Sequence, residues 1–216
     1  MGKGANTRVA ILDQAIHIAC DEGLEQVTFG NIAARLEMSK SGVHVHFRSI
    51  GNLQIDVVRT YARRFEQDVF EPVLVMPCGL ARLQAVFANW CRHVSAGMGR
   101  DALYIYRAGG ADERWEPVHD ALTHAVRGWR TELAHCVKQA VELGQLDAAT
   151  DPVQAAQEIY GLILLLHHDV RIFHDADAAT RAARTFQRLL NRSSGARQMT
   201  SNRDIGFRET PFSIAA

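Results

Sequence analysis

One short segment of this chain carries side chains whose types suit contacts with nucleic-acid bases. Those expected to face outward from it are Lys40, Ser41, Gly42, His44 and Val45. A lysine can donate to guanine O6 or N7, a serine to several base edges or a phosphate, and a valine can contact the thymine methyl group. A glycine lets the backbone come close to DNA, and the imidazoles of His44 and His46 suit phosphate oxygens. We therefore expect residues 40–46 to form a DNA-reading helix anchored from within by Val43 and Phe47.

Two short helices would position these side chains, because the same start signal occurs twice. The signals are Val27-Thr28 with Ile32, and Met38-Ser39 with Val43. Each combines a hydroxyl N-cap with apolar residues before it and four positions after it, which is typical of a capped and stapled helix start. The two helices are separated only by residues 36–38 and must cross sharply, so residues 28–47 are predicted to form a helix-turn-helix. Thr28 lies at a helix N-terminus, where unpaired amide donors favour a phosphate.

The overall charge excludes a general electrostatic attraction to nucleic acid. Lysine and arginine number 24, and aspartate and glutamate also number 24. Residues 39–64 nevertheless hold a single acid, Asp56, beside five basic residues: Lys40, Arg48, Arg59, Arg63 and Arg64. Any attraction to DNA must therefore be local.

On spacing alone, this segment could also be an ordinary capped helical hairpin in a bundle. The stretch from the first helix to Leu53, however, resembles the N-terminal domain of the TetR family of transcriptional repressors. The residues that carry the resemblance are Ile11-Leu12-Asp13-Gln14-Ala15, Gly23, Thr28, Ile32-Ala33, Ser39-Lys40-Ser41-Gly42, His46-Phe47, Ser49 and Leu53. The resemblance implies that Lys40, Ser41, Gly42, His44 and Val45 face the bases. It implies phosphate contacts for Thr28, His44 and His46.

The segment departs from the family pattern at several positions. His44 stands where an aromatic residue, often tyrosine, is usual. Ile50 replaces a common phosphate-binding lysine, and Gly51 and Asn52 replace common acids, so one backbone anchor is expected to be missing. Glu37 occupies a turn where glycine is frequent, and a left-handed conformation there would cost about 1 kcal/mol.

The rest of the chain also predicts helices, and the expected class is all-α. A first helix starting near Asn6 or Thr7 would stop at Gly23 in a left-handed conformation. A helix capped by Ser49 would end before Pro72, and its buried face would be Leu53, Val57, Val58, Tyr61 and Phe65. Further helical patterns cover residues 83–94, 117–143, 152–173 and 176–190. The inner face of the last helix would be Ala179, Ala182, Ala183, Phe186, Leu189 and Leu190. We predict a DNA-binding domain at 1–50, a helical effector-binding and dimerisation domain at 51–192, and a disordered tail at 193–216.

The segment Ile159–Leu166 indicates a homodimer, because it is apolar on every side. A helix of this kind needs two apolar partners, its own core and most simply a second copy of the chain. The helices at 152–173 and 176–190 would then form a four-helix bundle between two protomers. Such a dimer would present two recognition helices to a palindromic operator.

The resemblance also implies an effector pocket among the C-terminal helices, for an unidentified small apolar or aromatic molecule. Aromatic and histidine side chains are the candidates: Phe87, Trp90, Tyr104, Tyr106, Trp129, Tyr160 and His167. Plain core packing is the alternative for each of them. The expected function is that of a repressor that a small-molecule effector releases from DNA.

Other classes of function find little support. The sequence has no nucleophile elbow, phosphate-binding glycine loop or dinucleotide fingerprint, so we expect no enzyme, no catalytic residues and no cofactor. On the C-terminal helices we single out two pairs with metal-ligand spacing, Asp120 with His124 and Glu132 with Cys136, and we predict no metal site. A metal-responsive regulator, a DNA-binding adaptor without a ligand and a purely structural adaptor remain alternatives. The four cysteines are scattered along the sequence, so we expect them to be buried residues of a cytoplasmic protein. No apolar run approaches the roughly 20 residues of a membrane span.

Overall fold

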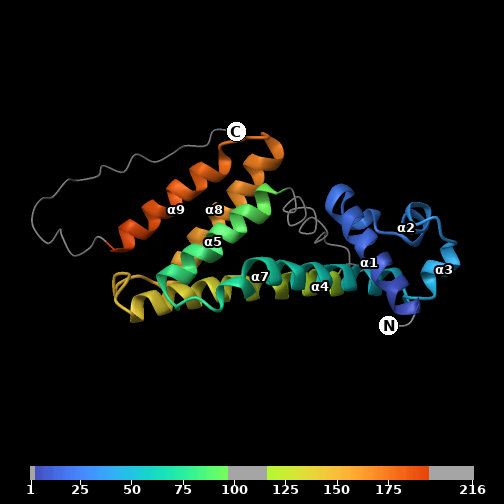
Figure 1. Cartoon of the computed structure of the whole chain (residues 1–216), viewed down its shortest axis with the longest axis horizontal. Coiled ribbons are helices and arrows are strands. Elements are labelled where there is room, and N and C mark those ends of the chain that lie inside the picture. The colour runs from blue at the N-terminus through green and yellow to red at the C-terminus, as the bar shows by residue number, and fades with distance from the viewer. Residues whose placement is uncertain (1–2, 97–115, 195–216) are drawn as a thin grey trace, which may run out of the picture.

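The computed structural model describes residues 3–96 and 116–194, and within them the chain forms helices and no strand (Figure 1). The N-terminal helices are α1 (Lys3–Glu22), η1 (Leu24–Gln26), α2 (Phe29–Arg35), α3 (Lys40–His44) and α4 (Ile50–Val69). The C-terminal helices are η2 (Glu71–Val73), α5 (Leu80–Ser95), α7 (Glu116–Glu142), α8 (Pro152–Ile172) and α9 (Ala178–Ser194). The all-α class is thus confirmed for this part of the chain. Tyr104, Tyr106 and the predicted tail from residue 195 onward lie outside it.

A small three-helix unit lies at one end of the molecule, and α4 runs from it into the helical body beside α7 (Figure 1). The core of the unit takes buried side chains from each helix: Ile11, Ala15, Ile18 and Ala19 of α1, Ile32 of α2, Val43 of α3 and Leu53 of α4. The predicted inner anchors Val43 and Phe47 are both buried. Because burial of apolar side chains drives folding, these anchors determine which face of α3 stays outside.

Hydroxyl caps start three successive helices, as the sequence predicts. Each hydroxyl oxygen accepts a hydrogen bond from the amide three residues later. The pairs are Thr28 with the Asn31 amide at 3.1 Å, Ser39 with the Gly42 amide at 3.0 Å, and Ser49 with the Asn52 amide at 3.1 Å. A cap of this type contributes about 1 kcal/mol, so these three residues fix where α2, α3 and α4 begin.

The turn between α2 and α3 contains a left-handed residue at the predicted position. Glu37 has φ 53°, and the Met38 amide donates to the Ala33 carbonyl at 2.9 Å. Gly23, after α1, also has a positive φ, of 104°. Its ψ of 155° differs from the left-handed helical conformation that the sequence predicts. Glycine permits that conformation without a steric penalty, whereas Glu37 pays one.

The recognition helix is shorter than predicted. The sequence suggests a helix to His46, whereas α3 ends at His44. The amides of His46 and Phe47 bond to carbonyls three residues back, at 3.2 and 3.1 Å, so the chain tightens into a turn there. This ending places Val45 and His46 on the turn that leads to α4.

Helix α4 joins the two parts of the molecule through its buried face. The predicted residues of that face are all buried: Leu53, Val57, Val58, Tyr61 and Phe65. Gln54 is buried as well, and its Nε2 donates to the carbonyls of Leu24 and Val27 at 3.2 Å each. A buried amide needs such partners, so Gln54 ties α4 to the chain that enters α2.

Helix α8 is covered on one side only. Ile159, Ile163 and Leu166 are buried against neighbouring helices, including α7 and α9. Other large apolar side chains of α8 and of the residue after it stay in contact with solvent: Leu165 at 54%, Ile172 at 58% and Phe173 at 66% exposure. No helix in the described ranges is long and apolar enough to cross a membrane.

Helix α9 extends further than the predicted 176–190, from Ala178 to Ser194. Of its predicted inner face, Ala182, Phe186 and Leu190 are buried, whereas Ala183 is exposed. The hydroxyl of Ser193 donates to the Leu189 carbonyl, which belongs to the last helical turn. Residues 193 and 194 therefore belong to the helix and not to the predicted tail.

One cysteine does not follow the prediction that all four are buried. Cys20, Cys91 and Cys136 are buried, but Cys78 is exposed because it lies in the turn between η2 and α5. Burial raises the pKa of the Cys91 thiol to about 12 and that of Cys136 to about 11. These two thiols stay protonated and unreactive at neutral pH.

Candidate nucleic-acid interface and ligand groove

The outward face of α3 carries most of the predicted base-reading side chains. Lys40, Ser41, His44 and Val45 are exposed, while Val43 and Phe47 point into the core. Val45 is 79% exposed, which leaves its methyl groups open to a partner. A thymine methyl is an apolar partner of suitable size in the major groove. The base-reading roles of these residues stay predictions.

Local packing gives a reason for glycine at position 42 that was not expected from the sequence. A Cβ at this position would lie 3.1 Å from the Ser39 hydroxyl and 3.6 Å from the Met38 terminal methyl. A larger residue would therefore press on the oxygen that caps α3. Glycine here protects the helix start, whereas a close approach of its backbone to DNA stays a prediction.

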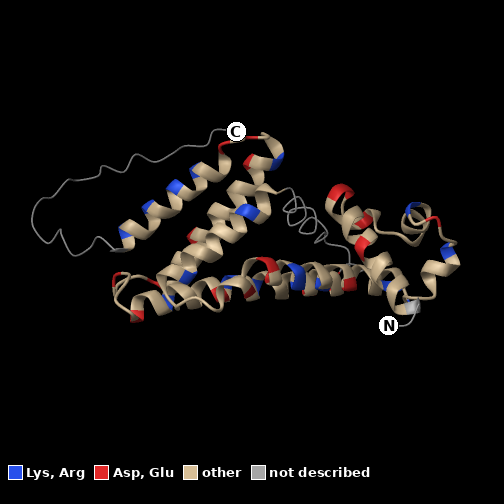
Figure 2. Cartoon of the chain, viewed as in Figure 1, with Lys and Arg blue, Asp and Glu red and all other residues tan. Residues whose placement is uncertain are grey.

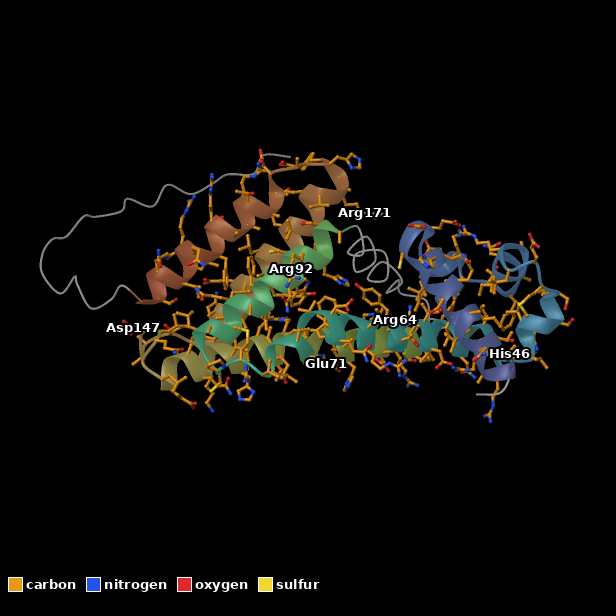
Figure 3. The ribbon with its side chains drawn as sticks, viewed as in Figure 1. His46, Arg64, Glu71, Arg92, Asp147 and Arg171 are labelled. Carbon is orange, nitrogen blue, oxygen red and sulfur yellow. The ribbon has the colours of Figure 1, made fainter. Side chains whose placement is uncertain are left out.

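The predicted phosphate-binding residues lie around the ends of α2 and α3. The His44 ring packs edge-on against Phe29 of α2, with ring centroids 5.1 Å apart. Thr28 accepts the cap hydrogen bond, so its own hydroxyl proton is left to donate to a phosphate. Figure 3 shows His46 at the outer end of the three-helix unit, and its side chain is half-buried. Phosphate contacts by these three residues stay predictions.

A basic hollow beside the recognition helix contains residues that the sequence analysis did not assign to the site. Its volume is about 460 Å³, and it is lined by Arg8, His46, Phe47, Arg48, Asn52, Ile55, Asp56 and Arg59. Arg48, Asn52 and Arg59 are exposed, and neither guanidinium pairs with a carboxylate within the described residues. We call this the basic hollow. Its excess of positive charge suits a phosphate. A phosphate contact here can replace the one that a lysine at the position of Ile50 would make.

Arg8 reaches the basic hollow from α1. Its Nη2 atom lies 2.5 Å from Asp56 Oδ2, and its guanidinium carbon lies 4.9 Å from the centre of the Phe47 ring. Both contacts hold the guanidinium in one place. Sequence spacing gives no sign of them, because Arg8 and Asp56 are 48 residues apart.

Other arginines at this end of the molecule, where Figure 2 shows acidic as well as basic residues, are neutralised by carboxylates. Arg35 pairs with Glu22, and Arg64 pairs with Asp13. Figure 3 shows Arg64 part-way along α4, away from the outer end where His46 lies. Residues 39–64 have an excess of basic residues in the sequence, but a carboxylate neutralises Arg64. The guanidinium groups of Arg48 and Arg59 keep their positive charge unpaired among the described residues.

The predicted pocket residues of the helical body fall into two separate groups. Trp90 and Trp129 both pack on Phe65, with ring centroids 4.8 and 4.3 Å apart, and Tyr160 lies 6.0 Å from Trp90. Phe87 instead stacks on Phe186 of α9 at 4.0 Å. His167 is also buried. We call the first group, with Phe65, the aromatic cluster.

Polar atoms of the aromatic cluster and its neighbour His93 are incompletely bonded. The indole nitrogens of Trp90 and Trp129 and Nε2 of His93 are buried and have no hydrogen-bond partner among the residues described. His93 packs edge-on against Phe65 at 5.2 Å. Its Nδ1 lies 3.7 Å from Asp68 Oδ2. Burial lowers the pKa of His93 because it disfavours the charged ring, and the Asp68 carboxylate opposes this effect.

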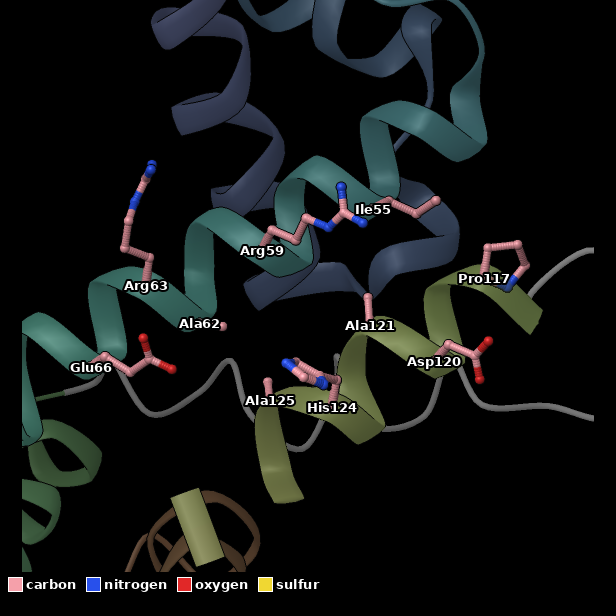
Figure 4. Close-up of a pocket in the computed structure, with 10 residues that line it drawn as sticks. All are labelled: Ile55, Arg59, Ala62, Arg63, Glu66, Pro117, Asp120, Ala121, His124 and Ala125. Carbon is pink, nitrogen blue, oxygen red and sulfur yellow. The ribbon is translucent and has the colours of Figure 1, made fainter. Parts of the chain in front are cut away.

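A groove of about 580 Å³ separates the first half of α7 from α4 (Figure 4). We call it the α4–α7 groove. Its apolar side chains are Ile55 and Ala62 of α4 and Pro117, Ala121 and Ala125 of α7. Its charged or titratable side chains are Arg59, Arg63 and Glu66 of α4 and Asp120 and His124 of α7.

No ion pair joins these five polar side chains, either across the groove or along one helix, in the part of the chain that the structure describes. Asp120 and His124 form one of the two pairs singled out for metal-ligand spacing, and both line the groove. Within the described residues, however, no group of three or more potential ligands could hold a metal ion. Among the described residues, the groove thus presents unpaired charges of both signs over an apolar floor.

Two family models match the chain. The model described as bacterial regulatory proteins, tetR family, matches residues 11–54. The model described as tetracyclin repressor-like, C-terminal domain, matches residues 79–186. Together they include α2, α3, half of the residues that line the basic hollow, the members of the aromatic cluster on α5, α7 and α8, and the α7 side of the groove. No curated protein sequence is similar enough to the chain to count as a match.

Solved structures share the whole architecture at low sequence identity. A transcriptional regulator from Saccharomonospora viridis in complex with choline has a TM-score of 0.74 at 15% identity, over 87% of this chain and 96% of its own. AibR in complex with isovaleryl coenzyme A and operator DNA has a TM-score of 0.69 at 22% identity, over 85% and 97%. The fatty acid degradation regulator FadR from Bacillus halodurans has a TM-score of 0.70 at 16% identity, over 91% and 98%. At these identities the likeness establishes the fold.

Proposed function

Because this chain belongs to the TetR family of transcriptional regulators, we propose that it is a homodimeric repressor released from operator DNA by a small molecule. The observation that carries the proposal is the outward face of α3. Lys40, Ser41 and Val45 are exposed there beside a capped helix start, while Val43 holds the helix to the core. A helix presented in this way can enter a major groove and contact base edges.

The surroundings of α3 support a firm hold on the DNA backbone. Thr28 and His46 lie at its margins, and the basic hollow adds the exposed guanidinium of Arg48. Contacts with phosphates position a protein on DNA, whereas contacts with bases specify the site. In this proposal Lys40, Ser41 and Val45 read the sequence and the surrounding groups set the register.

The exposed apolar side chains of α8 support dimerisation. Leu165, Ile172 and Phe173 would be shielded from water if α8 and α9 of two protomers packed together. A symmetric dimer would place two recognition helices about 34 Å apart, in successive major grooves of a palindromic operator. Transcription would be blocked by occupation of that site.

The path of α4 supports regulation by a ligand. This helix carries Leu53 into the core of the DNA-binding unit and Phe65 into the aromatic cluster. Relatives of the same fold hold choline or isovaleryl coenzyme A in their solved structures. A ligand between the helices would tilt α4 and change the spacing of the recognition helices, provided that it binds the two states with different affinity.

Selection of bound sequences from random double-stranded DNA tests the proposal. We expect a palindromic consensus for the full chain. Replacement of Lys40 by alanine should relax the preference at one position in each half-site, because one good base contact is worth about 1 to 3 kcal/mol of discrimination. Absence of any enriched sequence would contradict the role as a DNA-binding regulator.

A further inference from the structure

We propose that the α4–α7 groove binds a small zwitterion, a molecule with a carboxylate and an ammonium group joined by a short apolar chain. The ligand would be the effector, so this inference rests on the proposed function. It assigns the effector to the groove and not to the aromatic cluster.

The groove has room for a ligand because its facing side chains are small. Ala62 of α4 and Ala121 and Ala125 of α7 are half-buried, and their methyl groups leave a hollow of about 580 Å³ between the helices. Small-molecule sites are of this size, roughly 300 to 1,000 Å³. By contrast, the rings of the aromatic cluster already pack on one another, at centroid distances of 4.3 and 4.8 Å around Phe65.

The charges of the groove select for a ligand that carries both signs. Arg59 and Arg63 stand one helical turn apart, where like charges repel, and no carboxylate of the described chain neutralises either of them. Glu66 and Asp120 line the same space. A simple anion would meet those two acids, and a simple cation would meet the two arginines. A zwitterion can pair with one basic and one acidic side chain, and it leaves the net charge of the groove unchanged.

The arrangement along the helices indicates the length of the ligand. In Figure 4, Glu66 points from α4 toward α7 and His124 points from α7 toward α4, while Arg59 lies nearer the Ile55 end. Arg59 and Glu66 are seven residues apart, which is about 10 Å along a helix. A carboxylate near Arg59 and an ammonium near Glu66 therefore suit an ω-amino acid better than an α-amino acid.

The same groove can transmit binding to the DNA-binding unit. Arg59 and Ile55 line both the α4–α7 groove and the basic hollow next to the recognition helix. A ligand that holds Arg59 and contacts α7 would withdraw this guanidinium from the hollow and fix the tilt of α4. Both effects weaken the hold on DNA.

Calorimetric titration of the full chain without DNA tests the binding step. The probes are 6-aminohexanoate, hexanoate and hexylamine, which share one chain and differ in their charged ends. We expect 6-aminohexanoate to bind about tenfold more tightly than either of the others, the gain of one charge-assisted hydrogen bond. Equal affinity for the three probes, or no binding of any of them, would overturn the proposal.

Two variants locate the site. Glu66→Gln should weaken 6-aminohexanoate about tenfold and leave hexanoate unchanged, since only the ammonium loses its partner. Glu132→Gln, at an exposed position of α7 outside the groove, should change neither affinity. An unchanged titration in Glu66→Gln with an intact thermal transition would refute the site. If the chain also selects a palindromic DNA sequence, the proposed regulator survives and only the zwitterion site fails.

Discussion

The face of α3 and the space between α4 and α7 differ in where their functional groups come from along the chain. The predicted base-reading side chains belong to one stretch, residues 40–45, and four of them, Lys40, Ser41, His44 and Val45, are exposed because Val43 and Phe47 point inward. The groove takes residues 55–66 from one helix and residues 117–125 from another. One site is local and exposed, and the other exists only when two distant helices pack.

This difference has consequences for mutation. A substitution on the outside of α3 changes what the protein binds and leaves the fold intact, because those side chains have few contacts to lose. A substitution between the helices of the body changes stability first and ligand response with it. Variants of the two regions should therefore separate binding from folding.

The largest effect is expected for Phe65→Ala. The Phe65 ring packs on Trp90, Trp129, Phe70 and His93 and is 2% exposed. Its loss leaves a cavity and should lower the free energy of unfolding by about 3 to 5 kcal/mol. Urea unfolding followed by tryptophan fluorescence measures this change. Val45→Ala serves as the exposed counterpart and should stay within about 0.5 kcal/mol; similar losses in both variants would contradict the contrast between the regions.

The next largest effect should follow from Leu165→Glu. This side chain is 54% exposed in the single chain and lies on the surface proposed for dimerisation. A carboxylate there would be buried unpaired in the dimer, so we expect monomers and a loss of operator affinity of about 100-fold, because two linked half-sites bind far more tightly than one. Analytical ultracentrifugation gives the mass. Leu74→Glu, at a 61% exposed leucine in the turn after η2, should remain dimeric.

The parts that sequence reasoning predicted well are those with local causes. The hydroxyl caps at Thr28, Ser39 and Ser49 depend on hydrogen bonds between residues three positions apart, and all three bonds are present. The left-handed Glu37 stands where the family resemblance indicates a glycine turn, and its φ of 53° agrees with that expectation. The helix boundaries at His44 and Ser194 were missed by two to four residues, because terminal turns depend on weak bonds to carbonyls nearby.

The parts that could not be predicted depend on contacts between distant segments. The Arg8–Asp56 ion pair and the bonds from Gln54 to Leu24 and Val27 carry no pattern in the sequence. The α4–α7 groove forms where alanines of two helices face each other. Hydrophobic periodicity within one helix cannot predict which residues of another helix it will face. Phe65 was recognised as buried, yet its position at the centre of the aromatic cluster required the packing of α4, α5 and α7.

A smaller effect is expected for Arg48→Ala, which tests the basic hollow. Arg48 is exposed and unpaired within the described residues, so its guanidinium is available to a phosphate. Its loss should weaken binding to all DNA sequences alike and lower the slope of log K against log salt by about 1. Fluorescence anisotropy at several salt concentrations measures the slope. Arg35→Ala, which removes an arginine paired with Glu22, should leave it unchanged; equal slopes for both variants would exclude a phosphate contact by Arg48.

The smallest effect concerns the pH dependence of stability through His93. Burial lowers the pKa of this residue from its ordinary value of 6.5, against the opposing pull of Asp68. The unfolded chain therefore binds a proton more readily than the folded one, so the contribution of His93 is intact above pH 6.5 and is lost as the pH falls below that value. One group can change the free energy of unfolding by at most about 1.4 kcal/mol per pH unit. His93→Phe removes the proton site and should flatten the profile between pH 7 and pH 5 relative to the parent chain, in urea titrations at each pH. Asp68→Asn should steepen the profile, because it removes the carboxylate that favours the protonated ring, and an Asp68→Asn profile shallower than that of the parent chain would show that the carboxylate does not act on His93.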